Sequence, residues 1–297
     1  KPEFHVIPTD TINIHIDKDA LLRSGIMLPK TIRHLKGEDL KDAIPDKLYI
    51  PLTDIRMLTK VDLLMLEMLA NCNWERPLYL AISVGSVSKL KFDNYFVQEG
   101  LAFRFTPFDY KKWGDVGENR LYAVDVERLY DNVMNRYKYG GLDTPGLYLD
   151  ETTLRTCWYH RRLFAQLAKE LIAQGDNERA KKVLAYAEQV IPGYNVPETH
   201  ESGSYDIATA YAALGEKTKA VTLAVHLIAE AEDYINWAFS LKGNRIEMVR
   251  NDCIYKFWQW NQYNELLKKI DGEKYKESNR RFEEKYALFA PTMNYKN

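Results

Sequence analysis

The chain has 297 residues, of which 46% are hydrophobic, enough to bury one large or two ordinary cores, and we expect two subdomains. Its 41 Lys and Arg residues against 42 Asp and Glu residues leave a formal charge of −1, so nucleic-acid binding is not expected. Three widely spaced cysteines, Cys72, Cys157 and Cys253, argue against a disulfide framework or a zinc knuckle and predict buried thiols.

No apolar run approaches the roughly 20 residues that a helix needs to span a bilayer. The longest candidate, Leu78 to Val87, is interrupted by serine and glycine, so this part of the chain is expected to be soluble. The sequence starts at Lys1 without a methionine or a signal-like segment. We therefore expect it to be part of a longer or processed protein.

The first 60 to 80 residues alternate between short strand and helix signals. Alternating isoleucines predict a strand within residues 4–16, and two prolines divide residues 40–52 into a short helix, a turn and an extended piece. Thr59 is expected to cap a helix that Pro77 must stop. The helix should face a core with the apolar stripe Val61, Leu64, Met65, Met68 and Leu69.

Two more strands and a helix complete a small mixed α/β unit. Residues 78–84 are predicted to form a buried strand and residues 101–106 a second strand, whereas residues 109–119 read as a surface loop. Residues 125–139 show apolar positions at helical spacing. Pro145 and Gly146 mark the best domain boundary, so the first domain is predicted to be residues 1–145.

The second half, residues 146–297, contains two helix–turn–helix units with apolar residues where a tetratricopeptide repeat places them. In the first unit these are Phe164, Leu167, Ala168, Leu171, Gly175, Ala180, Leu184, Ala187 and Pro192. In the second unit they are Ile207, Ala208, Tyr211, Gly215, Ala220, Ala224 and Leu227. The offset of 40 residues from Gly175 to Gly215 exceeds the usual period of about 34, and the excess lies in the connector between the units.

Local signals place the ends of these helices. Asp150 should cap a long first helix and Asp176 the next one, while Gly175 and Gly215 should end helices with positive φ. A third helical layer is predicted from the stripe Ile246, Val249, Cys253, Phe257 and Trp260. The predicted class is α+β, mostly helical: a small α/β part followed by a tetratricopeptide-like α-α superhelix. Because two units cannot bury their own faces, we expect one rigid two-part body.

Four motifs carry a family resemblance, and we list them in chain order. They are Asn73 to Leu80; Glu99-Gly100-Leu101 with Arg104 and Pro107; Tyr130 to Asn135 with Gly140-Gly141-Leu142; and Tyr148 to Glu151. Together they resemble the extramembrane C-terminal region of the bacterial protein O-mannosyltransferase-like membrane glycosyltransferases, long described as a domain of unknown function. The resemblance covers nearly the whole chain, including the repeats.

The resemblance implies a parent protein with an N-terminal bundle of membrane helices that transfers sugar from a lipid-linked donor. It places this part outside the inner membrane, in the periplasm. The acidic catalytic residues of such enzymes belong to the membrane portion, so no catalytic residue is assigned here, and no metal or cofactor is expected. Whether this part has activity of its own stays open.

The chemistry-bearing residues also allow plain structural readings. His200 with Glu198 and Glu201 could suggest a metal site, but a metal needs about three protein ligands at defined spacing, and a connector loop fits better. Residues 158–162 (Trp-Tyr-His-Arg-Arg) could clamp a sugar or phosphate. We expect instead that the aromatic side chains of this segment pack against the repeat and that its arginines lie in solvent.

A candidate binding site follows from the repeat geometry, because the first helix of each unit builds the concave wall. The helices should expose Arg162, Ala165, Lys169 and Ile172 from one unit and Ser202, Tyr205, Thr209 and Ala212 from the next. From these we select Arg162, Lys169, Tyr205 and Thr209 as binding residues for a protein or peptide, such as a glycosylation acceptor. The competing reading is a groove filled by the chain's own N-terminal part.

Three functions remain open from the sequence. The first, which we favour, is a non-catalytic extracytoplasmic accessory domain that positions an acceptor protein or partner for a membrane glycosyltransferase. The second is a free-standing tetratricopeptide-type adaptor, which a start codon and signal peptide directly upstream would favour. The third is a soluble carbohydrate-active enzyme, which needs two carboxylates about 5–10 Å apart in a cleft, and no spacing in the sequence predicts that pair.

Overall fold

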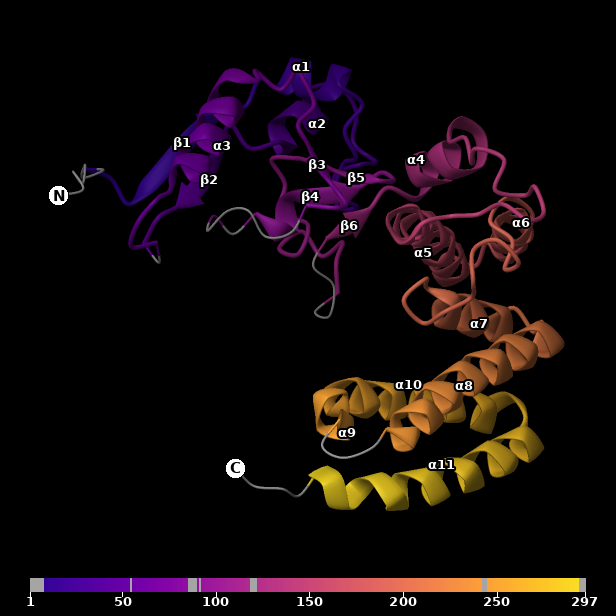
Figure 1. Cartoon of the computed structure of the whole chain (residues 1–297). Coiled ribbons are helices and arrows are strands. Elements are labelled where there is room, and N and C mark those ends of the chain that lie inside the picture. The colour runs from indigo at the N-terminus through magenta and orange to yellow at the C-terminus, as the bar shows by residue number, and fades with distance from the viewer. Residues whose placement is uncertain are drawn as a thin grey trace. The chain divides into compact units, whose positions relative to one another are not determined.

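The computed structural model describes residues 8–53, 55–84, 90, 92–117, 122–241 and 245–293. The chain divides into two compact units, unit 1 (Lys1–Asn132) and unit 2 (Val133–Asn297), which contain the elements labelled in Figure 1. Helices make up 57% of the chain and the small sheets lie in its N-terminal part, which confirms the α+β, mostly helical class. The predicted boundary between residues 145 and 146 and the rigid two-part body stay predictions.

Unit 1 contains two small sheets. In the first, β1 (Thr11–His15) pairs antiparallel with β2 (Lys47–Pro51), so that Ile12 lies opposite Ile50 and Ile14 opposite Leu48. This confirms the strands expected within 4–16 and 40–52, although residues 4–7 lie outside the described residues. The second sheet has the order β3-β5-β4-β6, with β4 and β6 parallel and the other pairs antiparallel. Its strands are β3 (Tyr79–Ala81), β4 (Phe96–Gln98), β5 (Ala102–Phe105) and β6 (Ala123–Val124).

Short helices surround these sheets. They are α1 (Lys18–Arg23), α2 (Gly37–Ala43), α3 (Lys60–Asn71), the 3-10 turn η1 (Asp93–Tyr95) and α4 (Val126–Asp131), which leads into the π-helical turn η2 (Asn132–Arg136). Trp74, just after α3, is buried, donates its indole N–H to the carbonyl of His15 at 2.7 Å and stacks on Phe105. One tryptophan therefore links the first sheet to the second.

The buried face of α3 differs from the expected one. Thr59 and Asp62 form the predicted cap, in which the Asp62 carboxylate accepts hydrogen bonds from the backbone N–H and the hydroxyl of Thr59, each at 2.7 Å. Leu66 and Leu69 then face the core together with Asp62, whereas Val61, Leu64 and Met68 of the predicted stripe are exposed. Apolar residues occupy nearly every face of this helix, so the spacing alone could not select the buried one.

Two further expectations for unit 1 are wrong. The strand predicted to be buried at residues 78–84 is the short edge strand β3, and the Tyr79 side chain is exposed. The segment expected to be a surface loop packs inward, because Tyr110 and Val116 are buried and the Tyr110 hydroxyl donates to the carbonyl of Met27 at 2.5 Å. The segment was predicted to be a surface loop because polar residues surround the few aromatic side chains that pack into the core. Residues 118 and 119 of that prediction lie outside the described residues.

Unit 2 is built from successive helix pairs that pack side by side (Figure 1). Its helices are α5 (Glu151–Ala173), α6 (Asn177–Val190), α7 (Ser204–Ala213), α8 (Lys217–Ser240), α9 (Arg245–Met248), α10 (Arg250–Ile270) and α11 (Gly272–Met293). Helix α5 contacts α6 and α7, α8 contacts α7 and α10, and α10 contacts α11. The pairs α5/α6 and α7/α8 coincide with the two predicted units, and membership of the tetratricopeptide class stays a prediction.

The helix ends of unit 2 follow the local signals. Asp150 accepts hydrogen bonds from the backbone N–H groups of Thr152 and Thr153, and Asp176 accepts one from the N–H of Arg179. Gly175 and Gly215 have φ of 80° and 77°, as predicted for residues that end helices. The small residues of the two units are fully buried where the helices cross: Ala168, Ala180, Ala208 and Ala220. The three cysteines are free and buried, as predicted.

Candidate functional site

The connector between α6 and α7, residues 191–203, is held by a buried arginine. Arg161 on α5 is 3% exposed, and its two terminal nitrogens donate four hydrogen bonds. They go to the carbonyls of Pro197 at 2.8 Å, Ile191 at 3.0 Å and Val196 at 2.6 Å and to the hydroxyl of Ser202 at 3.1 Å. The connector, which accounts for the offset of 40 residues between the two units, is thus held in place by the Arg161 side chain.

Arg161 corrects the expectation that the arginines of this segment lie in solvent. Its partners are neutral oxygens, and burial lowers the pKa of its guanidinium to about 10, which leaves the charge in place at neutral pH. A buried cation costs free energy unless hydrogen bonds replace its water. The carbonyls of the connector supply these bonds, so the connector and Arg161 stabilise each other.

The connector carries His200 into a cluster of aromatic rings, which we call the aromatic face: His200, Tyr205, Tyr255, Trp258 and Tyr263. The ring of His200 stacks on Tyr205 at 5.8 Å and lies edge-on to Trp258 at 5.6 Å. Its Nδ1 lies 2.8 Å from the hydroxyl of Tyr263. Tyr255 and Trp258 are parallel to each other, with ring centroids 5.6 Å apart and planes at 12°. Both remain open to solvent, at 44% and 48% exposed.

Charged groups border the aromatic face. The carboxylate of Glu201 accepts a hydrogen bond from Gln259 at 3.1 Å and lies 3.9 Å from the ammonium of Lys256. Burial raises the pKa of Glu230 on α8, and burial also lowers the pKa of His200. A carboxylate and an ammonium group therefore lie close to each other at the border of the aromatic face.

The structure places the four predicted binding residues differently. Tyr205 belongs to the aromatic face through its contact with His200. Arg162 lies next to it, because it donates to the carbonyl of Glu201, the residue after His200, through Nε at 2.6 Å and through Nη2, and its guanidinium lies over the ring of Tyr159. Lys169 is exposed, and Thr209 donates its hydroxyl to the carbonyl of Asp206 at 2.8 Å. Within the described residues, no hydrogen bond or ring contact joins Lys169 or Thr209 to the aromatic face.

Two residues expected on the concave wall are not exposed. Ala165 lies on α5 and is buried. Ser202 is also buried, and its hydroxyl accepts a hydrogen bond from Arg161 and donates one to the carbonyl of Thr199. Sequence reasoning also missed Tyr255 and Trp258. Their signal was present, since two aromatic residues three positions apart lie on the otherwise polar side of α10, but only the predicted core stripe of that helix was considered.

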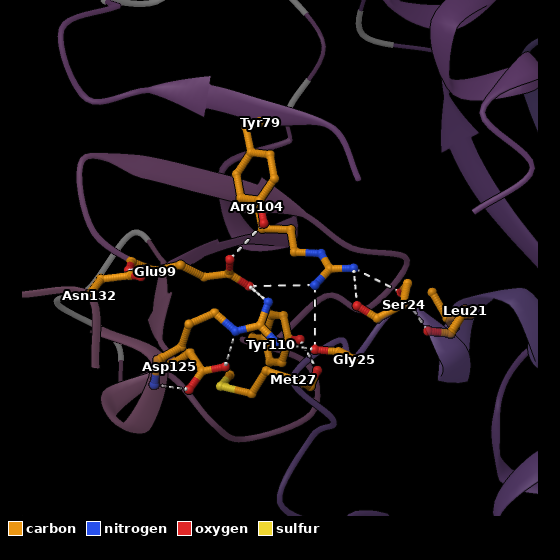
Figure 2. A network of polar contacts seen from close by, with 11 residues as sticks. Leu21, Ser24, Gly25, Met27, Tyr79, Glu99, Arg104, Tyr110, Asp125 and Asn132 are labelled. Atoms are coloured by element: carbon orange, nitrogen blue, oxygen red, sulfur yellow. Dashed lines mark hydrogen bonds and ion pairs between the residues drawn. The ribbon is translucent and has the colours of Figure 1, made fainter. Parts of the chain in front are cut away.

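A second polar cluster lies in unit 1 and is shown in Figure 2. Glu99, which is buried, accepts a hydrogen bond from the hydroxyl of Tyr79 at 2.8 Å and one from Arg128 at 3.1 Å, and lies 3.7 Å from Arg104. Arg104, also buried, donates to the carbonyl and the hydroxyl of Ser24 at 3.0 Å and 2.8 Å. These contacts tie the end of α1 to the second sheet.

This polar network has the properties of a structural clamp. Its side chains use one another as partners, and a cavity beside it, lined by Ser24 and Arg104 among others, measures about 10 Å³. That volume is far below the few hundred cubic ångströms of a small-molecule site. Burial and the bond to Glu99 raise the pKa of Tyr79, so its hydroxyl stays a donor. Tyr79, Glu99 and Arg104, which belong to the motifs of the family resemblance, therefore have a structural role in unit 1.

His200, Glu198 and Glu201 all lie in the connector between α6 and α7. In the part of the chain that the structure describes, no three His, Cys, Asp or Glu residues come together as a metal-binding group. The ring of His200 is instead occupied by its aromatic neighbours and Tyr263. Among the same residues, no helix combines the length and apolar character needed to cross a membrane.

A comparison with known protein families gives a match in the N-terminal part of the chain. Residues 1–127 are similar to a family described as TMEM260-associated domain 2. The matched residues include both sheets of unit 1 and the polar network apart from Arg128 and Asn132, and they leave the helices of unit 2 outside the match. No curated protein and no solved structure matches the chain.

Proposed function

We propose that this chain is the extracytoplasmic accessory part of a protein O-mannosyltransferase-like membrane glycosyltransferase, and that unit 2 binds a protein partner through the aromatic face. The similarity of residues 1–127 to a domain described as associated with TMEM260 supports an accessory role. The four motifs quoted from the sequence support the glycosyltransferase context. In this proposal, membrane attachment and sugar transfer belong to a preceding part of the protein, and this part lies in the periplasm.

The exposed pair Tyr255 and Trp258 is the observation that carries the binding role. Tyrosine, tryptophan and arginine contribute most of the energy at protein interfaces, and all three gather here with Arg162. The two rings already pack against each other and against His200, so little side-chain freedom is lost when a partner covers them. The aromatic face therefore resembles a prepared anchor for a partner.

The charged border defines the kind of partner. Arg162 and Lys256 are cations beside the rings, and the Glu201 carboxylate already has Lys256 and Gln259 as neighbours. Arg162 holds the connector through Nε and Nη2. A protein segment that places an apolar or aromatic residue on Trp258 and a carboxylate near Arg162 would complement this surface. The acceptor protein of the glycosyltransferase is the partner that we expect.

The test is photo-crosslinking in envelope extract with the 297-residue chain carrying a photoreactive residue at Asn251, on the exposed side of α10. We expect wild type to capture secreted or envelope proteins that carry O-linked sugar. The Tyr255→Ala/Trp258→Ala variant should lose about tenfold of this capture. Trp237→Ala, which removes an equally exposed tryptophan from α8, should change it by less than about twofold.

Two further variants test the contributions of the predicted binding residues Arg162 and Lys169 separately. Arg162→Ala should weaken capture because Arg162 lies at the aromatic face, and Lys169→Ala should have little effect because no contact places it there. Equal capture by wild type and the Tyr255→Ala/Trp258→Ala variant, or a captured set without glycoproteins, would refute the proposed function.

A further inference from the structure

A cleft of about 400 Å³ lies in unit 2 between α6, the connector, α7 and α8. Its lining does not include the rings of the aromatic face. Apolar side chains such as Leu184, Ile191 and Leu223 form part of its wall. The polar lining comes from Glu188, Glu198, Tyr211, Lys219, Thr222 and His226. This volume is within the range of small-molecule sites and is too small for a folded segment.

One side of the cleft is fixed by hydrogen bonds around Glu188. Its carboxylate accepts from the hydroxyl of Tyr211 at 2.5 Å and from the ammonium of Lys219 at 2.8 and 3.0 Å. Burial and this bond raise the pKa of Tyr211, so that its hydroxyl remains a donor. The three side chains come from α6, α7 and α8, and their mutual contacts hold them in place before any ligand enters.

The opposite side carries Glu198 from the connector. Its backbone carbonyl lies 3.2 Å from Nε2 of His226, and its side chain packs so closely on Gly193 that a Cβ there would lie 3.3 Å from Glu198 Cδ. Within the described residues, the Glu198 carboxylate has no hydrogen-bond or ion-pair partner. It is therefore an acceptor that faces the cleft with capacity to spare.

The charges of the cleft balance. Glu188 and Glu198 are matched by Lys219 and by Arg161, whose terminal nitrogens are already bound to the connector. The lining thus offers carboxylate acceptors and ammonium and hydroxyl donors without a net charge that would select an ion. Sugar hydroxyls both donate and accept, and the ring carbons of a sugar suit apolar wall residues.

From this arrangement we propose that the cleft binds a neutral polyhydroxylated ligand, one or two sugar units in size. The site lies apart from the aromatic face and does not depend on the function proposed for it. The Glu198 carboxylate accepts hydrogen bonds from hydroxyl groups of the ligand, while Lys219 and Thr222 offer donors at the cleft. Because Glu188 already accepts three hydrogen bonds from Tyr211 and Lys219, Glu198 is the acceptor that gains most when the sugar binds.

The experiment is calorimetric titration of the 297-residue chain with a panel of probes: methyl α-mannopyranoside, methyl β-glucopyranoside, N-acetylglucosamine, glucosamine and glucuronic acid. We expect at least one neutral sugar to bind with a Kd in the micromolar to millimolar range. Glu198→Ala should weaken that binding about tenfold or more. Glu178→Ala, which removes an exposed carboxylate on α6 outside the cleft, should leave it within about twofold.

A second pair of variants tests whether the ligand occupies the space of the cleft. Thr222→Trp on α8 should fill the cleft and abolish binding, whereas Thr156→Trp, at an exposed position of α5, should not. Thermal unfolding checks that both variants are folded, and a misfolded Thr222→Trp leaves the decision to Glu198→Ala. Binding of only glucosamine or only glucuronic acid would overturn the neutral ligand class. Absence of binding by every probe, or equal affinity in Glu198→Ala and wild type, would overturn the site.

Discussion

Replacement of Arg161 by methionine is the sharpest test of how unit 2 is held together. The substitution keeps an unbranched apolar stem in α5 and removes the guanidinium that binds three carbonyls and one hydroxyl of the connector. Four hydrogen bonds from a charged group are lost together. The carbonyls of Ile191 and Val196 lie in the buried part of this network and lose a partner.

The magnitude follows from two opposing contributions. Hydrogen bonds to a charged group contribute about 1.5–3 kcal/mol each, which would give about 6–12 kcal/mol for four. The folded protein also no longer has to desolvate a cation, and the connector can turn its carbonyls towards water, which returns several kcal/mol. We expect the difference between these two contributions to be a net loss of about 3–5 kcal/mol in the free energy of unfolding.

The assay is urea unfolding followed by tryptophan fluorescence, with hydrogen exchange of the backbone amides of residues 191–203 as a local readout. Arg162→Met is the matched control, because this neighbouring arginine is exposed and its hydrogen bonds go to a single carbonyl, that of Glu201. We expect the control to cost about 1 kcal/mol or less. If both variants unfolded at the same urea concentration and the connector exchanged as slowly as in wild type, Arg161 would not organise the connector.

Four other substitutions test separate parts of the fold by chemical denaturation. Gly203→Ala should lower the free energy of unfolding by about 1–3 kcal/mol, because Gly203 has φ of 84° and a Cβ would lie 2.9 Å from Arg162 Cγ; no change would contradict this close approach. Leu69→Ala, at a 3% exposed position of α3, should cost about 2–5 kcal/mol, whereas Leu64→Ala, at 63% exposed, should cost less than about 0.5 kcal/mol, and the reverse order would restore the predicted stripe. Burial lowers the pKa of His200 below 6.5, so that on acidification the unfolded chain is protonated at this histidine before the folded chain is. The free energy of unfolding should therefore fall as the pH drops below about 6.5. His200→Asn should weaken that pH dependence, and an unchanged pH profile would refute the role of His200.

The parts of the fold that could be predicted are those decided within a few residues. Helix caps and helix-ending glycines act on backbone groups of the same turn, as Asp150, Asp176 and Gly175 do. Their effect therefore depends only on residues close in the sequence. The buried alanines of the two helix pairs follow from periodicity, because a small residue at helical spacing is needed wherever two helices cross. The helical architecture was therefore accessible from the sequence.

The predictions that failed concern residues whose environment is set by segments distant in the sequence. Leu64 and Leu69 are chemically the same and lie on one helix, and only packing against the sheets of unit 1 decides which is buried. Arg161 and Arg162 are adjacent and identical, yet one is enclosed by the connector and the other is exposed. In the candidate site, Arg162 and Tyr205 were found because they lie on predicted concave helices, while Trp258 on α10 was missed.

The long connector gives a physical link between the two candidate surfaces of unit 2. It contributes His200 to the aromatic face and Glu198 to the cleft, and Arg161 fixes the segment that carries both. A substitution at Arg161 should therefore weaken protein capture and sugar binding together, although Arg161 presents no free terminal donor to either ligand. Trp258→Ala and Glu198→Ala should each affect one activity alone. Loss of only one activity in Arg161→Met would show that one of the surfaces is organised without the connector.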